Sequence, residues 1–516
     1  MIMKTLLLGL LIVLSSAGLA QSTVTISNNI TQDRTFHCDT IYILDTAVFV
    51  ENGATLTIQA GTVIKGTPGM GVDASFLIIA KGAKIEAIGT PAHPIIFTST
   101  SDDITNAHPN YPGWANLDTS ITNTGLWGGL IVLGDAQISA VTPSIIIEGL
   151  PIDPISEYGG NNNTDNSGTI QYVSIRHGGT NIGLGNEIGG LTLAAIGAGT
   201  TVDHIELLAC QDDGLDVFGG VVNISHVIST SSYDDGIDTD QGYSGTIDNF
   251  IVYDANDASI ELDGPEGADL GLGNHELVNG TVFLTEDSNE LTDTDANTNV
   301  DMSNVFWFGM NPNGYSYGQI FTELPTTSVV SPTFSNLEVA IPTGESVTDY
   351  FLNGTSPFAL DLTVGSQTVG AIICEFAGWS SSYVEGLLTT DFVVNSSGCI
   401  DPISGNYCQY ATSSTNCNYD TVLSCGLTIG LAENPSGLGL FEVYPNPTND
   451  QFIIDLSSGD LNANYYSVVD TRGRIIAEGV ITNNLTQVSA HLWSKGMYIL
   501  NLRSENGLTT TKILKE

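Results

Sequence analysis

Two groups of carboxylates stand close together in the stretch 210-CQDDGLDVFGGVVNISHVISTSSYDDGIDTD-240. Each group reads Asp-Asp-Gly-aliphatic-Asp, and the second begins 22 residues after the first. Acids in this pattern can shape tight turns by bonding the local backbone, hold calcium through their oxygens, or supply the acid and base of a sugar-cleaving enzyme. The candidate metal ligands are Asp212, Asp213, Asp216, Asp234, Asp235, Asp238, Asp240, Asp257, Glu261 and Asp263.

A six-residue pattern around these acids indicates which elements must position them. The order apolar, any, polar, apolar, any, apolar begins at Ile170, Val202, Ile224 (a shorter copy), Ile247, Met302 and Phe334. The starts are 32, 22, 23, 55 and 32 residues apart, and the longest interval has room for another copy near Val278. Because apolar residues alternate along a strand, the first position can face the core only if the chain bends at the polar third position. Short strands, a polar corner and turns of this length predict an all-β fold, a right-handed parallel β-helix whose coils lie about 4.8 Å apart.

The same alignment arranges the acids in columns, one coil apart. One column contains Asp212, Asp234 and Asp257, and another contains Asp216, Asp238 and Glu261. Two carboxylates about 5 Å apart repel each other by roughly 3 kcal/mol at a dielectric constant near 20. We therefore expect the stacked acids to turn toward solvent, hold protons or take up a cation, and calcium is the cofactor that we predict.

Polar and aromatic side chains near the acids offer further candidates. His204 and His226 occupy the polar corner of adjacent copies, between Tyr172 and Asn249, which predicts a stacked polar ladder rather than a metal site at these histidines. Aromatic residues that could form sugar-stacking platforms, or equally be half-buried core residues, are Trp127, Tyr243, Trp307 and Tyr315.

Residues 40–380 resemble a family of exported bacterial β-helix proteins with the pectin-lyase-like architecture. The segments that carry the resemblance are 61-GTVIKG-66, 172-YVSIRHGG-179, 211-QDDGLDVFGG-220 and 234-DDGIDTDQGYSGTIDNF-250. The resemblance implies the fold, which hosts lyases, hydrolases, adhesins and binding proteins alike. The segment 233-YDDGID-238 also resembles polygalacturonase-type hydrolases, but the later His-Gly and Arg-Ile-Lys segments of those enzymes are absent downstream.

The charge distribution argues against several functions. The chain has 57 acidic and 12 basic residues, and no Lys or Arg occurs between Arg176 and Arg472. Such an acidic surface repels nucleic acid and anionic lipid. A uronate substrate needs a cation opposite its carboxylate, and a lyase of this fold would need Arg or Lys as its base. We therefore expect no turnover of pectate, alginate or polygalacturonate.

The first residues have the features of a secretory signal peptide: Lys4, an apolar run over 6–14 and small residues up to Ala20. The run is too short to span a bilayer and no cysteine follows the cleavage point, so we expect an exported, soluble protein without a lipid anchor. The expected organisation is a signal peptide at 1–20, the β-helix at 21–340, a cap or irregular extension at 341–398, a Cys-rich linker at 399–435 and a C-terminal β-sandwich at 436–516.

Seven cysteines fit an oxidising compartment. Four of them share one short segment that has no Cys-x-x-Cys spacing and no nearby histidine, so we predict two disulfides among Cys399, Cys408, Cys417 and Cys425, with three possible connectivities. The remaining three, Cys38, Cys210 and Cys374, leave an odd thiol.

The C-terminal region consists of short alternating strands between turn residues, the pattern of a small β-sandwich. It closely resembles the type A C-terminal sorting domain of the type IX secretion system of Bacteroidetes. The matching residues are Tyr444, Pro445, Asn446, Pro447, Gly473, Gly496, Tyr498, Lys512 and Lys515. The resemblance implies recognition by the type IX machinery, passage through the outer membrane, removal of the tail, and surface attachment or release.

These observations together favour a secreted or cell-surface β-helix protein that binds a glycan or another surface without catalysis. A carbohydrate-active enzyme that uses the Asp-rich coils, a polysaccharide hydrolase or lyase, is the alternative.

Overall fold

The computed structural model describes residues 22–515, apart from 105–120, 148, 183–187, 268–269, 285–290, 311–326, 329, 352–355, 395–396, 399–407, 412, 415–441, 457–462, 471–474, 482, 492 and 505–506. The expected signal peptide, Tyr315, Cys399, Cys417, Cys425 and Gly473 lie outside the described residues. None of the helices within these ranges is long and apolar enough to cross a bilayer.

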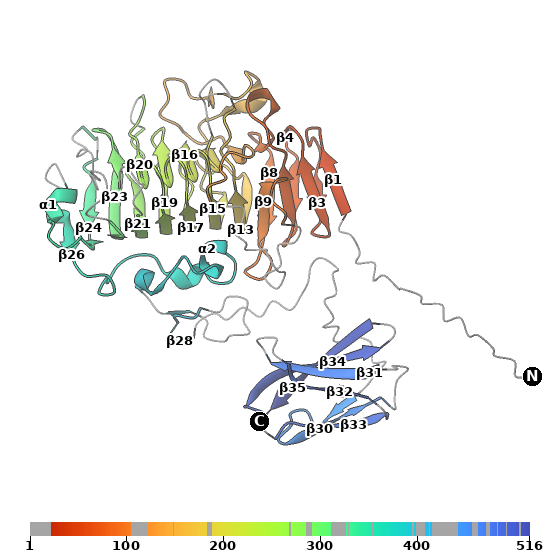
Figure 1. Cartoon of the computed structure of the whole chain (residues 1–516). Coiled ribbons are helices and arrows are strands. Elements are labelled where there is room, and N and C mark those ends of the chain that lie inside the picture. The colour runs from red at the N-terminus through yellow and green to blue at the C-terminus, as the bar shows by residue number, and fades with distance from the viewer. Residues whose placement is uncertain are drawn as a thin grey trace, which may run out of the picture.

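Most of the described chain is a parallel β-helix built from two sheets, which confirms the predicted fold (Figure 1). Sheet A contains β1 (Ser22–Ile26), β2 (Arg34–Phe36), β3 (Thr40–Leu44), β5 (Thr55–Ile58), β6 (Val63–Gly66), β8 (Lys84–Ile88), β9 (Ile95–Ser99), β13 (Gly168–Arg176), β15 (Thr201–Leu208), β17 (Ile224–Thr230), β19 (Thr246–Tyr253), β21 (His275–Phe283), β23 (Val300–Phe308), β24 (Thr333–Ser335), β25 (Leu337–Val339) and β26 (Ala359–Asp361). Sheet B contains β4 (Ala47–Val50), β7 (Phe76–Ile79), β10 (Leu130–Leu133), β14 (Leu191–Ile196), β16 (Leu215–Gly220), β18 (Ile237–Asp240), β20 (Ile260–Leu262) and β22 (Asp293–Thr294).

From β13 to β23 the chain alternates between the two sheets, so each coil adds one strand to sheet A and one to sheet B. Neighbouring strands are parallel and in step, with Val202 beside Ile224 and Ile224 beside Ile247. The 22-residue interval in the sequence is therefore the length of one short coil. Inward-facing aliphatic side chains from both sheets form a continuous core along the coils.

Each long strand of sheet A bends at the polar third position of the repeat, as predicted. The residues at this corner all have positive φ: Tyr172 (51°), His204 (56°), His226 (54°), Asn249 (58°), Asn279 (58°), Asn304 (59°) and Asn336 (52°). The copy expected near Val278 is present in β21, with Asn279 at its corner. Asparagine visits this left-handed region more readily than most residues, which explains why it fills four of these corners.

Residues 371–394, here called the strap, lie along the outer face of sheet A. The strap contains η4 (Ile373–Phe376), α2 (Ser381–Val384) and η5 (Thr390–Phe392). Its apolar side chains pack against outward-facing residues of sheet A that include Ile228, Ile251 and Phe306. It runs back along the coils, because Ile372 N donates to Asn249 Oδ1 on β19 whereas Ser382 N donates to Glu206 Oε1 on β15. Between β25 and the strap lie α1 (Val347–Tyr350), η3 (Ser356–Phe358) and β26.

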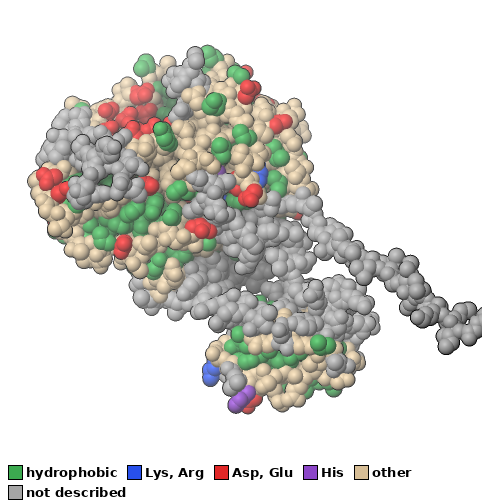
Figure 2. All heavy atoms as spheres, viewed as in Figure 1, with side chains coloured by type: hydrophobic (Ala, Val, Ile, Leu, Met, Phe, Trp, Pro, Cys, Tyr) green, Lys and Arg blue, Asp and Glu red, His purple; other side chains and the backbone are tan. Residues whose placement is uncertain are grey.

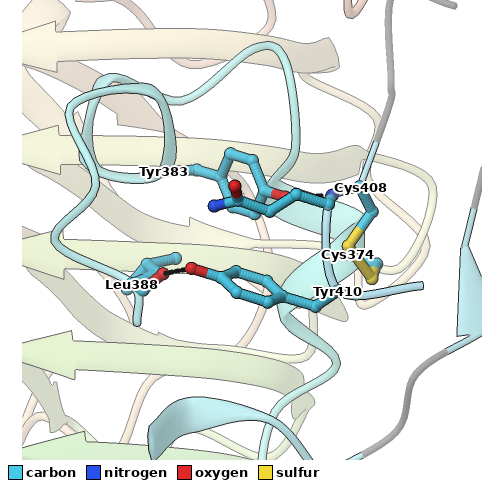
Figure 3. Close-up of a disulfide and its surroundings, with 6 residues drawn as sticks. Cys374, Tyr383, Leu388, Cys408 and Tyr410 are labelled. Atoms are coloured by element: carbon cyan, nitrogen blue, oxygen red, sulfur yellow. Dashed lines mark hydrogen bonds between the residues drawn. A yellow bond between two sulfur atoms is a disulfide. The ribbon is translucent and has the colours of Figure 1, made fainter. Parts of the chain in front are cut away.

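A disulfide between Cys374 and Cys408 anchors the strap, flanked by bonds from Gln409 N to the Tyr383 hydroxyl and from the Tyr410 hydroxyl to Leu388 O (Figure 3). The predicted pairing within the Cys-rich segment is therefore wrong for Cys408. Cys38 is also disulfide-bonded, so the free thiol among the described cysteines is the buried Cys210. The sequence could not show this pairing because no periodicity marks the strap as folding back along sheet A.

Smaller elements complete the described chain. The β-helix has a short η1 (Gly71–Asp73), an η2 (Pro154–Ser156) and an antiparallel pair, β11 (Ile145–Ile146) with β12 (Glu157–Tyr158). The strands β27 (Ser397–Gly398) and β28 (Ser413–Ser414) pair next to the disulfide. The C-terminal region forms two antiparallel sheets: β29 (Glu442–Tyr444), β30 (Gln451–Asp455) and β33 (Leu485–Ser489), and then β31 (Ala463–Asp470), β32 (Ile475–Val480), β34 (Gly496–Ser504) and β35 (Gly507–Lys515). Their shared core, with Phe452, Val488, Leu500 and Ile513, confirms a small β domain.

Candidate functional site

The acids of the two Asp-Asp-Gly-aliphatic-Asp segments meet on the outer face of sheet B. In β16, Leu215 and Val217 belong to the core, so the residue between them, Asp216, points outward. The register places Asp216 beside Asp238 and Asp238 beside Glu261, which confirms the alignment predicted for this column. We call Asp213, Asp216, Asp235, Asp238 and Glu261 the acidic cluster.

The turn acids that precede each strand connect neighbouring coils. Asp213 Oδ1 accepts a hydrogen bond from Asp235 N at 3.1 Å, and Asp235 Oδ1 accepts one from Ala258 N at 2.6 Å. Asp257 N donates to Asp234 O, so the column of Asp212, Asp234 and Asp257 is also in register. The carboxylates of Asp213 and Asp235 thus each satisfy a backbone donor of the next coil, which is one physical reason for repeating the pattern.

The acidic cluster is largely shielded from solvent. Asp213, Asp216 and Asp235 expose 8%, 3% and 4% of their surface. Burial, together with the neighbouring carboxylates, raises the pKa of Asp213, Asp216 and Asp238 well above the ordinary range. Burial and a hydrogen bond with Glu261 raise the pKa of Asp235 to about 12. Without a cation, protons must therefore neutralise part of the cluster.

Two oxygens of the cluster have no hydrogen-bonding partner among the described residues. Both are buried: Asp216 Oδ1 and Asp238 Oδ1. Oxygens of Asp213, Asp216 and Asp238 lie within 4.8 Å of one another, as do oxygens of Asp212, Asp213 and Asp234. The two trios share Asp213 and offer only oxygen, the donor that calcium prefers. The residues present therefore fit a calcium ion, whereas zinc would favour nitrogen or sulfur.

Further acids form a rim around the cluster. Burial raises the pKa of Asp240 and Asp263 to about 7, with contributions from neighbouring acids such as Glu261. Asp257 is exposed. Figure 2 shows acidic side chains gathered at the upper left of the β-helix, in the part of the molecule that contains β20 in Figure 1.

The basic residue nearest to the acids in sequence is not available to a ligand. Arg176 is 1% exposed and lies on sheet A beneath the strap. Its Nη2 lies 3.9 Å from Glu206 Oε2 and donates to Ser381 Oγ at 2.6 Å. Arg176 therefore forms a buried ion pair with Glu206, and its hydrogen bond to Ser381 holds the strap against sheet A.

The proposed sugar-stacking platforms are wrong for every described member. Trp127 and Trp307 are 0% exposed and Tyr243 is 2% exposed, because their side chains belong to the core inside the coils. An exposed aromatic residue beside the acids is Tyr233, which directly precedes Asp234. The histidine ladder is present: the rings of Tyr172, His204 and His226 stack with successive centroids 4.2 Å apart.

Two features of the acids were missed in the sequence. Asp293 continues the column beyond Glu261, but Thr292 precedes it where an aliphatic residue precedes the earlier acids, so the pattern is interrupted there. Asp203 contacts both ladder histidines, but its position in the repeat looks like that of any surface residue.

Comparison with known proteins gives two family matches. Residues 28–286 match the family described as a pectate-lyase-like beta helix domain, and residues 442–516 match the secretion system C-terminal sorting domain. No curated protein and no solved structure matched the chain. The sorting domain implies interaction with the type IX secretion machinery and secretion to the cell surface or outside the cell. The first match covers half of the chain and agrees with its parallel coils, so the chain belongs to the pectate-lyase-like beta helix family.

Proposed function

We propose that this secreted or surface protein binds an external glycan or another surface without cleaving it, through calcium held by the acidic cluster. The observation that carries the proposal is a pair of buried oxygens in adjacent strands, Asp216 Oδ1 and Asp238 Oδ1, that have no hydrogen-bonding partner among the described residues. A buried carboxylate oxygen without a partner costs about 1–3 kcal/mol or more, which a bound cation would remove.

Calcium takes six to eight oxygen ligands. Asp213, Asp216 and Asp238 supply carboxylate oxygens on one side, and the half-buried Asp212 and Asp234 lie at the solvent side. An ion held there keeps positions open to solvent, where hydroxyl or carboxylate oxygens of an external ligand can coordinate. Tyr233 stands next to this opening and offers an exposed ring to an apolar sugar face.

Two observations support binding rather than catalysis. Asp213 and Asp235 are engaged with backbone donors of the next coil, and Arg176 is sealed beneath the strap. Asp213 and Asp235 are therefore not freely placed to cleave a uronate, and the basic residue nearest to them in sequence is out of reach. The second candidate, a carbohydrate hydrolase, has one observation in its favour: Asp235 shares a hydrogen bond with Glu261 and has a raised pKa, as a general acid requires.

Calcium calorimetry and a polysaccharide panel test the proposal. The mature protein is expected to bind calcium at millimolar or lower concentration, and Asp216→Asn/Asp238→Asn to lose that binding. Calcium-dependent retention on one or more neutral or anionic polysaccharides, without new reducing or unsaturated ends, is expected. The proposal would be contradicted if calcium titrated into the wild-type protein gave no heat of binding. It would also be contradicted if the wild type released products that Asp235→Asn does not release.

A further inference from the structure

A second group of acids lies where the strands of sheet B end, whereas the turn acids of the acidic cluster lie where those strands begin. Asp240 is the last residue of β18, and Asp263 directly follows β20 on the next coil. Asp263 N donates to Thr239 O at 2.8 Å, which holds the two strand ends side by side. Glu266 and Asp295, in the turns beyond, are exposed. We call Asp240, Asp263, Glu266 and Asp295 the strand-end acids.

The long connection between β10 and β12 closes one side of this group. Ser139 N donates to Gln241 O at 2.8 Å, and Glu266 N donates to Ser139 Oγ at 3.2 Å. Three segments that are distant in the sequence therefore meet at the strand ends. Asp240 is only 9% exposed there, whereas Asp263 is half-buried, so the group forms a partly enclosed site that opens to solvent.

Gln241 offers a hydrogen-bond acceptor to this site. Its backbone N–H donates to Asp240 Oδ1, and its side-chain amide interacts with the same carboxylate, so the side chain lies against Asp240. Gln241 is 3% exposed, and its Oε1 has no hydrogen-bonding partner within the described ranges. Because a buried carbonyl oxygen in this state is costly, it favours a ligand that donates a hydrogen bond.

The charged neighbours of the strand-end acids are themselves acids. Glu266 and Glu261 are the charges that most affect Asp240, and Glu261 and Asp295 are those that most affect Asp263. The chain has no Lys or Arg from 177 to 471 that could balance them. The site therefore favours a ligand that carries positive charge.

The spacing of these acids distinguishes the site from the acidic cluster. In the part of the chain that the structure describes, the trios of acids whose oxygens lie within 4.8 Å of one another include neither Asp240 nor Asp263. Calcium takes six to eight oxygens, so it suits the acidic cluster better than the strand ends. A primary ammonium group has three N–H donors and needs only three acceptors, of which Gln241 Oε1 can be one.

We propose that Asp240, Asp263 and Gln241 Oε1 bind a primary ammonium group of an external ligand, which Glu266 attracts from the exposed side. The two carboxylates balance the charge through charge-assisted hydrogen bonds, and the amide oxygen accepts the third N–H. Amino sugars of a glycan and small linear diamines both carry such a group. The site does not include the buried oxygens of Asp216 and Asp238, so it does not depend on the calcium-binding function proposed above.

Calorimetry at pH 7 tests the site, in excess calcium so that the acidic cluster is occupied. The probes are putrescine and a short glucosamine oligomer, and the fully N-acetylated oligomer is the ligand control. We expect saturable binding of one or both probes, weakened by added salt, and no binding of the control. Binding of the oligomer alone would identify an amino sugar as the source of the ammonium group, and binding of putrescine alone a small amine.

Asp240→Asn and Gln241→Met should each weaken probe binding by about 10–100-fold, because each removes an acceptor of a charged hydrogen bond. Glu266→Gln changes an exposed side chain and should weaken binding to a smaller extent without risk to the fold. Glu86→Gln, on the outer side of sheet A, is the charge-matched control and should bind like the wild type. Failure of both probes to bind, or equal affinity in the wild type, Asp240→Asn and Gln241→Met, would overturn the site.

Discussion

At the scale of single residues, Asp216 and Asp238 determine what the acidic face can do. Each points outward from a strand, yet each keeps a buried oxygen without a partner among the described residues. Neighbouring hydrogen bonds satisfy the turn acids Asp213 and Asp235, but not these two. The same side chains therefore destabilise the coils when ionised and offer oxygens to a cation.

Asp216→Asn should raise the free energy of unfolding in chelator, by up to about 3 kcal/mol at a pH where Asp216 and Asp238 are both ionised, because it removes one of two adjacent buried charges. The same variant should lose most of the stabilisation by calcium. Thermal melts of wild type and variant, each with calcium and with chelator, measure both effects. Glu86→Gln, on the outer side of sheet A, is the charge-matched control and should respond to calcium like the wild type.

At the scale of elements, the corner residues show why the fold could be predicted from the sequence. Positive φ at the polar position recurs in every copy from Tyr172 to Asn336, and two alternating apolar residues follow it in most of these copies. The columns of stacked acids could be predicted from the same alignment of the coils. The strap could not be predicted, because its contacts with Asn249, Glu206 and Arg176 join residues more than 100 positions apart without any periodic pattern.

Asn249→Ala should lower the free energy of unfolding by about 2–3 kcal/mol. Alanine is strained at φ 58°, by about 1–2 kcal/mol, and it cannot accept the hydrogen bond from Ile372 N, which contributes about 1 kcal/mol. Asn249→Gly keeps the backbone relaxed and loses mainly the hydrogen bond, so it should cost less. If Asn249→Ala and Asn249→Gly lowered the free energy of unfolding equally in chemical denaturation, alanine would not be strained at this corner.

Cys374→Ser should loosen the strap. The Cys374–Cys408 bond closes a loop with a sequence separation of 34, and removing such a crosslink costs about 3–4 kcal/mol in the chain-entropy estimate. Limited proteolysis should then cut the strap before the coils. The double variant Cys374→Ser/Cys408→Ser should behave like the single one, and a stronger effect of the double variant would point to another partner for Cys408.

At the scale of the whole molecule, the C-terminal domain has its own core and matches a sorting domain. Deleting residues 436–516 should leave the β-helix folded but stop it in the periplasm, because the type IX machinery no longer recognises it. Fractionation of cells that express the deletion variant measures its location, and circular dichroism of the purified body measures its folding. Normal surface display of the truncated chain would disprove the assignment.

The stability of the β-helix should depend on pH in a direction set by the acidic face. Asp240 and Asp263 have pKa values of about 7 in the folded chain, above the value of about 3.9 for an unfolded aspartate. Between these values the folded state binds more protons than the unfolded state, so the free energy of unfolding falls as pH rises from about 4 to 7. The pKa values of Asp213, Asp216 and Asp238 are also raised, which adds to the fall.

Calcium should weaken this dependence of stability on pH, because a bound cation stabilises the ionised carboxylates that otherwise destabilise the folded chain as the pH rises. The measurement is a series of melts from pH 5 to 8, with calcium and with chelator, on wild type and on Asp240→Asn/Asp263→Asn. The double variant has the same other titrating groups, including His204, whose lowered pKa acts in the opposite direction. The difference in free energy of unfolding between the two proteins therefore reports on Asp240 and Asp263 alone. We expect the difference in free energy of unfolding between wild type and double variant to grow with pH in chelator and to vanish with calcium. A difference that stays constant with pH would show that Asp240 and Asp263 are ionised throughout.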